Sequence, residues 1–146
     1  MTTATSELKP GFNNKRFQQT LLVVYAVIWI YLAIDPLYRP EWLLENLLVF
    51  ALLPLLFFTY KEKSLSDLSY LLLTIFMILH AVGSHYGYSD VPIGFTIKEI
   101  FGFTRNPYDR IVHFSYGFLF AYPIYEALLR YAKFKSAWLY ILPVTF

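Results

Sequence analysis

Long apolar runs constrain the fold of this chain more than any other feature. Four of them are long enough to cross a bilayer as helices, namely Phe17–Ile34, Trp42–Tyr60, Leu68–Gly83 and Pro107–Tyr131. A membrane-spanning helix needs about 20 mostly apolar residues, with a range of about 17–25. None of the runs alternates as a membrane β-strand does, and only closed helices then satisfy the backbone inside lipid. The sequence therefore predicts an all-α integral membrane protein.

The composition supports this class and excludes others. Hydrophobic residues make up 58% of the chain and charged residues 15%, whereas a soluble domain carries about 25% charged residues. The net charge of +2 provides no basic field for nucleic acid. The chain has no cysteine, which excludes disulfides and cysteine-ligated metals. We therefore expect the lipid bilayer, and not nucleic acid, to be the main partner.

The two ends of the chain differ in character. Residues 1–16 are polar and have no cleavage site of a secretory signal peptide, so we expect a polar tail. A further apolar run, Ala137–Phe146, rises only about 15 Å as a helix, which is about half of the hydrocarbon core. We expect this run to begin a fifth helix that continues beyond Phe146. Residues 17–146 would then form a single membrane domain with four transmembrane helices and a truncated fifth.

The basic residues predict the orientation of the spans. Loops on the cytoplasmic side of a membrane protein carry an excess of Lys and Arg. One set of span ends is richer in these residues than the other, and it includes the N-terminus, which is therefore expected to be cytoplasmic. The richer set comprises Lys9, Lys15, Arg16, Lys61, Lys63, Arg130, Lys133 and Lys135, and the poorer set comprises Arg39, Lys98, Arg105 and Arg110.

The loop between the third and fourth spans, residues 84–106, falls on the outer side in this orientation. Its middle part places Ile93, Ile97, Ile100 and Phe101 on one face of a helix. An amphipathic segment of this kind lies in the membrane interface. We expect it to cover the outer end of the bundle, and the alternative is an irregular loop.

Ionisable residues inside the apolar runs are the candidate functional residues. His80 and His113 each lie about 9 Å below the outer end of their run, and Glu45 lies about 4.5 Å below the end of its own. Asp109 precedes His113 by four residues and shares its helix face, and His85 stands with Asp109 at the mouth. Ionisable groups are costly inside lipid, so their common depth predicts a polar site in the outer half of the bundle. The alternative is hydrogen bonding between helices, such as a bond from Glu45 to His80.

This set of residues suggests more than one function. The first hypothesis is a metal-dependent enzyme that acts on a lipid or another amphiphile, because histidine and carboxylate ligands with an open position for water suit zinc or a similar divalent metal. Haem b between His80 and His113 is a second hypothesis. A proton-coupled transporter is a third, and a purely structural membrane protein is the fourth. The candidate metal ligands are His80, His113, Asp109, Glu45 and His85.

Three linked motifs carry a resemblance to a known family, and they read LENLLVFALLPLL, LHAVGSHYGYSDVPIGF and RNPYDRIVHFSYGF. From Asp35 to about Arg130 the chain resembles the YjdF-like family of bacterial inner-membrane proteins. The resemblance implies a multi-pass helical protein of the inner membrane, and it brings no catalytic residue with it. Members of that family are longer, with further spans and acidic residues in the C-terminal part, and this chain departs from them by ending at Phe146.

Overall fold

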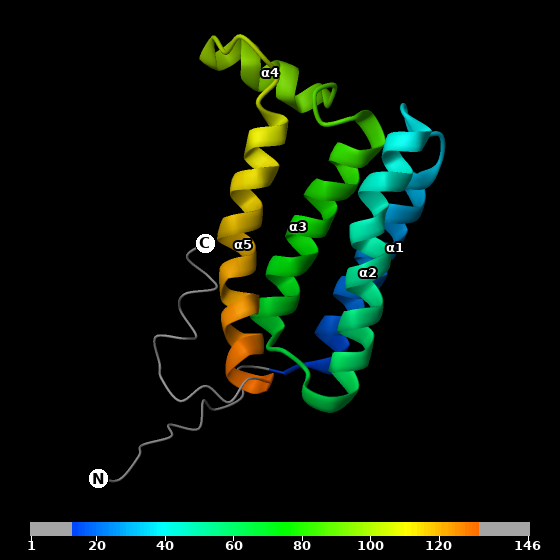
Figure 1. Cartoon of the computed structure of the whole chain (residues 1–146), viewed down its shortest axis with the longest axis vertical. Helices are drawn as coiled ribbons and strands as arrows, with labels where there is room; N and C mark the ends of the chain where they lie inside the picture. Colours follow the sequence, from blue (N-terminus) through cyan, green and yellow to red (C-terminus); the bar gives the residue numbers. More distant parts are fainter. Residues whose placement is uncertain (1–12, 132–146) are drawn as a thin grey trace, which may run out of the picture.

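The computed structural model describes residues 13–131, which form a bundle of long helices with one short helix across an end (Figure 1). The predicted all-α fold is confirmed for this part of the chain. The run at residues 137–146 lies outside the described residues, as does most of the polar tail. In chain order the helices are α1 (Lys15–Ala33), α2 (Arg39–Lys63), α3 (Asp67–Tyr86), α4 (Pro92–Phe101) and α5 (Tyr108–Tyr131).

Within the described residues, α1, α2 and α3 are long and apolar enough to cross a membrane. Helix α5 has 24 residues, which corresponds to about 36 Å. It is not among these three candidates. The number of spans and the side on which the N-terminus lies remain predictions.

Helix α3 is the centre of the bundle, and it contacts α1, α2 and α5. In the apolar stretch of α3, 44% of the residues are buried, against 17% in α1 and 17% in α2. Phe76 of α3 meets Phe120 of α5 edge to face, with ring centroids 4.8 Å apart. The outward faces of the surrounding helices carry exposed apolar side chains such as Val27, Leu44 and Phe118. This arrangement is typical of a helical bundle whose solvent is lipid.

A buried carboxylate holds the start of α3 at what we call the far end of the bundle, where α1 and α3 begin and α5 ends (Figure 1). Glu126 of α5 accepts hydrogen bonds from the backbone N–H of Ser66, at 2.9 Å, and from its hydroxyl, at 2.8 Å. The hydroxyl of Ser69 and the guanidinium of Arg130 donate to the same carboxylate. Arg130 also donates to the carbonyl of Ser64 at 2.6 Å. A negative charge at a helix N-terminus is stabilised by the helix dipole. The carboxylate of Glu126 therefore ties α5 to the start of α3, and it also forms an ion pair with Arg130 on its own helix.

A second carboxylate at the far end joins α1 to α3. Asp67 accepts from the backbone N–H of Asn14 at 2.9 Å and from the side-chain amide of Gln18 at 2.6 Å. The side-chain oxygen of Asn14 in turn caps α1 by accepting from the backbone of Arg16 and Phe17. The side chain of Asp67 thus holds the first turns of α1 and α3 together, and the side chain of Asn14 satisfies free N–H groups of α1.

Helix α4 lies at the opposite end, which we call the α4 end (Figure 1). The expected amphipathic helix in the loop after α3 is confirmed. Its Ile93, Ile100 and Phe101 are exposed, as befits a helix whose apolar side chains meet a membrane interface.

Asn106 fixes α4 relative to α5. Its side-chain oxygen caps α5 by accepting from the backbone N–H of Tyr108 at 3.0 Å, and its amide donates to the carbonyl of Val91 at 3.0 Å. A Cβ atom on Gly94 would lie 1.8 Å from the Asn106 side-chain oxygen. Only glycine therefore fits where α4 passes over this cap.

We predict that Glu126→Gln lowers the free energy of unfolding by about 2–4 kcal/mol, because the buried donors around the carboxylate lose a charged acceptor. The matched control is Glu99→Gln on the exposed surface of α4, which should stay within about 0.5 kcal/mol of the parent. Unfolding of the purified protein in detergent, followed by tryptophan fluorescence against denaturant, measures both. Equal effects of the two changes would contradict the role assigned to Glu126.

Candidate functional site

His80 is buried on α3 and uses both ring nitrogens within the protein. Its Nε2 lies 3.0 Å from the backbone carbonyl oxygen of Glu45 on α2, and its Nδ1 lies 2.6 Å from the hydroxyl of Tyr88. A carbonyl only accepts, so Nε2 carries the proton, and Nδ1 accepts from the tyrosine. The ring also stacks on Phe76, with an interplanar angle of 18°. This geometry defines a neutral histidine that joins α2, α3 and the loop after α3.

Tyr88 reaches His80 because Gly83 leaves room for its ring. A Cβ atom on Gly83 would lie 2.5 Å from a ring carbon of Tyr88. Burial, followed by the nearby carboxylate of Glu45, raises the pKa of the Tyr88 hydroxyl. The hydroxyl therefore stays protonated and remains a donor to His80.

Glu45 meets His80 through its backbone and not through its carboxylate. The expected hydrogen bond between the two side chains is thus replaced by one to a carbonyl, which passes no proton onward. Among residues 13–131, no group of three or more His, Asp or Glu side chains is arranged to hold a metal. The structure does not bring the side chains of Glu45, His80 and His113 together, and their roles as metal ligands stay predictions.

Asp109 and His113 form a separate pair on α5. The Nε2 atom of His113 lies 3.3 Å from a carboxylate oxygen of Asp109, which confirms that the i, i+4 spacing places them on one face. The side chains are 80% and 51% exposed, so this face points away from α3. His80 and His113 therefore share no cavity, and the pair of axial ligands that haem b needs is not formed within the described residues.

His85 joins the end of α3 to the end of α1 and to the loop that follows it. Its Nδ1 donates to the carbonyl of Leu32, at the end of α1, over 2.7 Å, and its backbone carbonyl accepts from the N–H of Leu37 over 2.8 Å. The loop between α1 and α2 also contains Asp35 in the left-handed region, at φ 52°. His85 thus fastens this turn to the end of α3.

Asn46 is a buried polar residue that the sequence analysis missed. It is fully buried on α2, accepts from the indole N–H of Trp29 at 2.6 Å, and donates to the carbonyl of Trp42 at 2.7 Å. Trp29 and Trp42 also contact each other, with centroids 5.9 Å apart. The sequence feature that could have revealed Asn46 was its polar amide inside an apolar run, since such groups need partners across helices.

Comparison with known proteins settles the family. The family described as "Predicted membrane protein (DUF2238)" matches residues 17–146. The chain belongs to this family. It is also 35% identical over 126 residues to the inner membrane protein YjdF of Escherichia coli (strain K12), a match that covers 86% of this chain and 58% of that protein. No solved structure gives a significant match.

The resemblance drawn from the three motifs is therefore confirmed. With its apolar helices and an inner-membrane relative, this DUF2238 protein is a protein of the bacterial inner membrane. The chain spans 58% of the length of the curated relative that it matches.

We predict that Gly83→Ala destabilises the protein by about 1–3 kcal/mol, because the added methyl group displaces the Tyr88 ring from His80. Gly117→Ala on α5 is the matched control, since a Cβ atom there meets nothing within 4 Å. That change should be neutral or stabilising by up to about 1 kcal/mol, because alanine favours helix more than glycine does. Thermal unfolding in detergent distinguishes the two, and an equally harmless Gly83→Ala would show that the Tyr88–His80 contact is dispensable.

Proposed function

We propose that this DUF2238 protein binds a divalent metal such as zinc at Asp109 and His113, and acts with it on an amphiphile at the membrane surface. The observation that carries the proposal is the difference among the three histidines. His80 has both ring nitrogens bonded inside the protein, and His85 is bound to α1. Within the described residues, the ring of His113 has Asp109 as its hydrogen-bonding or ionic partner and is otherwise open.

The spacing of the pair supports a metal. Zinc binds histidine nitrogen at about 2.0–2.1 Å and carboxylate oxygen at about 2.0–2.2 Å, so a tetrahedral angle separates the two ligand atoms by about 3.4 Å. The Nε2 atom of His113 and the nearest oxygen of Asp109 are 3.3 Å apart. The separation of the two atoms is thus compatible with one shared ion.

The surroundings of the pair favour an amphiphile over a water-soluble substrate. Asp109 and His113 lie in the first turns of α5, at the end of the bundle where α4 exposes its apolar side chains (Figure 1). Further along α5, on another face of the helix, Phe114 and Phe118 are 75% and 70% exposed and stack on each other at an interplanar angle of 7°. The outward surface of α5 is thus apolar just below the level of the pair, which suits the chain of an amphiphile whose headgroup lies at the interface.

The chemistry of the side chains assigns a role to each residue of the proposed site. The Nε2 atom of His113 and a carboxylate oxygen of Asp109 would hold the metal and leave its other positions to water and substrate. A metal with open positions supplies a bound water whose pKa is about 7. Arg110 is exposed beside the pair, and its guanidinium suits an anionic headgroup.

We predict that the purified protein binds zinc in near-stoichiometric amount, and that His113→Ala and Asp109→Asn each weaken binding by at least about tenfold, the lower limit for loss of a supporting group at a metal site. Both side chains are exposed, so folding should be preserved. Glu99→Gln is the control for a carboxylate near the site. Calorimetric titration of tag-free protein in detergent measures binding. Mass spectrometry of bacterial lipids in vesicles that contain the protein, with and without chelator, detects turnover. Absence of zinc binding in the parent protein would overturn the proposal.

The proposal also retains the expected orientation, with the α4 end on the outer face of the inner membrane. Its support is the excess of basic residues at the other end of the spans. A substrate would then be met outside the cytoplasm.

The lack of cysteine in the chain makes this orientation directly measurable. We predict that Glu99→Cys, on α4, reacts with a membrane-impermeant maleimide in intact spheroplasts. Lys15→Cys, at the start of α1, should react only after the membrane is opened. Both positions are exposed, so reactivity reports the side of the membrane. The reverse pattern would place the α4 end in the cytoplasm.

A further inference from the structure

A groove opens on the side of the bundle near the far end, between α1 and α2, with α3 as its floor. Its volume is about 670 Å³, which falls within the about 300–1,000 Å³ of ligand sites. The groove follows α1 from Gln18 to Tyr25, a rise of about 10.5 Å. Its walls are mostly apolar and include Tyr25, Leu53, Phe57, Tyr60, Leu73 and Met77.

Two polar atoms of the groove residues have no partner. Across residues 13–131, the buried side-chain oxygens and nitrogens without a hydrogen bond are Oε1 of Gln18 and the hydroxyl of Tyr25. Both side chains are more than nine-tenths buried and line the groove. The amide nitrogen of Gln18 donates to Asn13 and Asp67, which fixes the oxygen in its unpartnered position. Unpaired polar groups are costly in an apolar setting, so these atoms indicate a ligand that supplies their partners.

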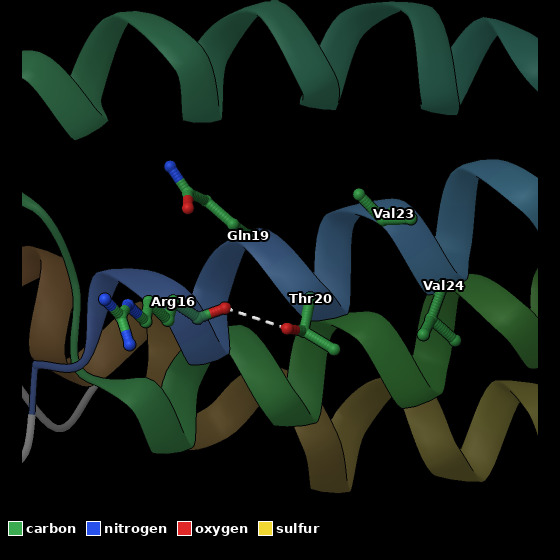
Figure 2. Close-up of a pocket in the computed structure, with 5 residues that line it drawn as sticks. All are labelled: Arg16, Gln19, Thr20, Val23 and Val24. Atoms are coloured by element: carbon green, nitrogen blue, oxygen red, sulfur yellow. Dashed lines mark hydrogen bonds between the residues drawn. The ribbon is translucent and has the colours of Figure 1, made fainter.

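A basic side chain lies beside the groove, near the start of α1. Arg16, Gln19 and Thr20 line a shallow depression of about 370 Å³ on α1, and Gln19 lines both this depression and the groove. Figure 2 shows Gln19 extending from α1 towards α2, with Arg16 one turn nearer the start of the helix. A guanidinium and an amide beside an apolar channel suit a phosphate with an attached acyl chain.

We propose that the groove binds one molecule of an anionic phospholipid with hydroxyl groups in its headgroup, namely phosphatidylglycerol. The phosphate binds Arg16 and Gln19, and one acyl chain lies between α1 and α2 against α3. The unpartnered oxygen of Gln18 accepts from a headgroup hydroxyl. This site is at the opposite end of the bundle from Asp109 and His113, so it stands or falls independently of the proposed metal site.

The hydroxyl of Tyr25 donates a hydrogen bond to the same lipid in this proposal. Long side chains in a helix point back towards its N-terminus, so this hydroxyl lies nearer the start of α1 than the Cα atom of Tyr25 does. An ester carbonyl of a phospholipid follows directly after its phosphate and glycerol, and it is an acceptor for the tyrosine. A lipid bound in this way satisfies both unpartnered atoms at once.

Thermal unfolding of the whole chain in detergent, with added phosphatidylglycerol or phosphatidylcholine, tests the headgroup. Phosphatidylglycerol should raise the midpoint of unfolding more than phosphatidylcholine does. Arg16→Gln should weaken this response about tenfold in lipid concentration, as expected for loss of one charged phosphate contact. Lys15→Gln removes the same charge one residue away, outside the groove, and should leave the response unchanged. Equal effects of the two lipids would show that the headgroup is not recognised. Equal effects of the two substitutions would show that the response reflects surface charge. Either result would overturn the proposal.

A second pair of variants tests the groove itself. Leu53→Trp fills it from α2, whereas Leu47→Trp adds the same bulk on the exposed side of that helix. Native mass spectrometry should show that the first variant loses the retained phosphatidylglycerol and that the second keeps it. Retention by both variants would overturn the proposal, as would a change of oligomeric state with Leu53→Trp and no loss of lipid, which would assign the groove to a second copy of the chain.

Tyr25→Phe separates a bound lipid from simple packing. The change removes an unpartnered hydroxyl, so the lipid-free protein should unfold at the same or a higher temperature. Its additional stabilisation by phosphatidylglycerol should fall, since the ester carbonyl loses its donor. An undiminished response to the lipid would exclude the contact assigned to Tyr25 and overturn that part of the proposal.

Discussion

The carboxylate of Glu126 binds the start of α3, and the other long helices are arranged around that helix. At the opposite end of α3, His80 and His85 bind carbonyls of α2 and α1. The hydrophobic effect contributes little to the association of helices inside lipid, because lipid tails are as apolar as the side chains. The depth and rotation of α3 are therefore set by polar bonds near its two ends, with apolar packing between them.

Much of this architecture could be predicted from sequence. Apolar runs place the long helices to within a few residues, and the amphipathic helix expected after the third span is confirmed as α4. The pairing of Asp109 with His113 also follows from spacing alone, because residues four apart on a helix are neighbours. These features are local, so the chain encodes them over a few turns.

The rest of the site depends on how each helix is rotated, and spacing does not determine rotation between helices. Distance from a span end gave His80 and His113 the same depth, yet one ring faces the core and the other faces outward. The acceptor for His80 is the backbone of Glu45, and any residue at that position would supply the same carbonyl. Gly83 is needed because Tyr88 folds back onto it, a contact between a helix and a loop that residue patterns do not reveal.

The double role of Asn106 has a mechanical consequence. One side chain caps α5 and holds the residue that precedes α4, and Gly94 packs directly over it. Tilting α4 would therefore pull on the first turn of α5, which contains Asp109. A tilt of α4 in the membrane interface would thus be transmitted to the turn that carries Asp109 through the one side chain of Asn106.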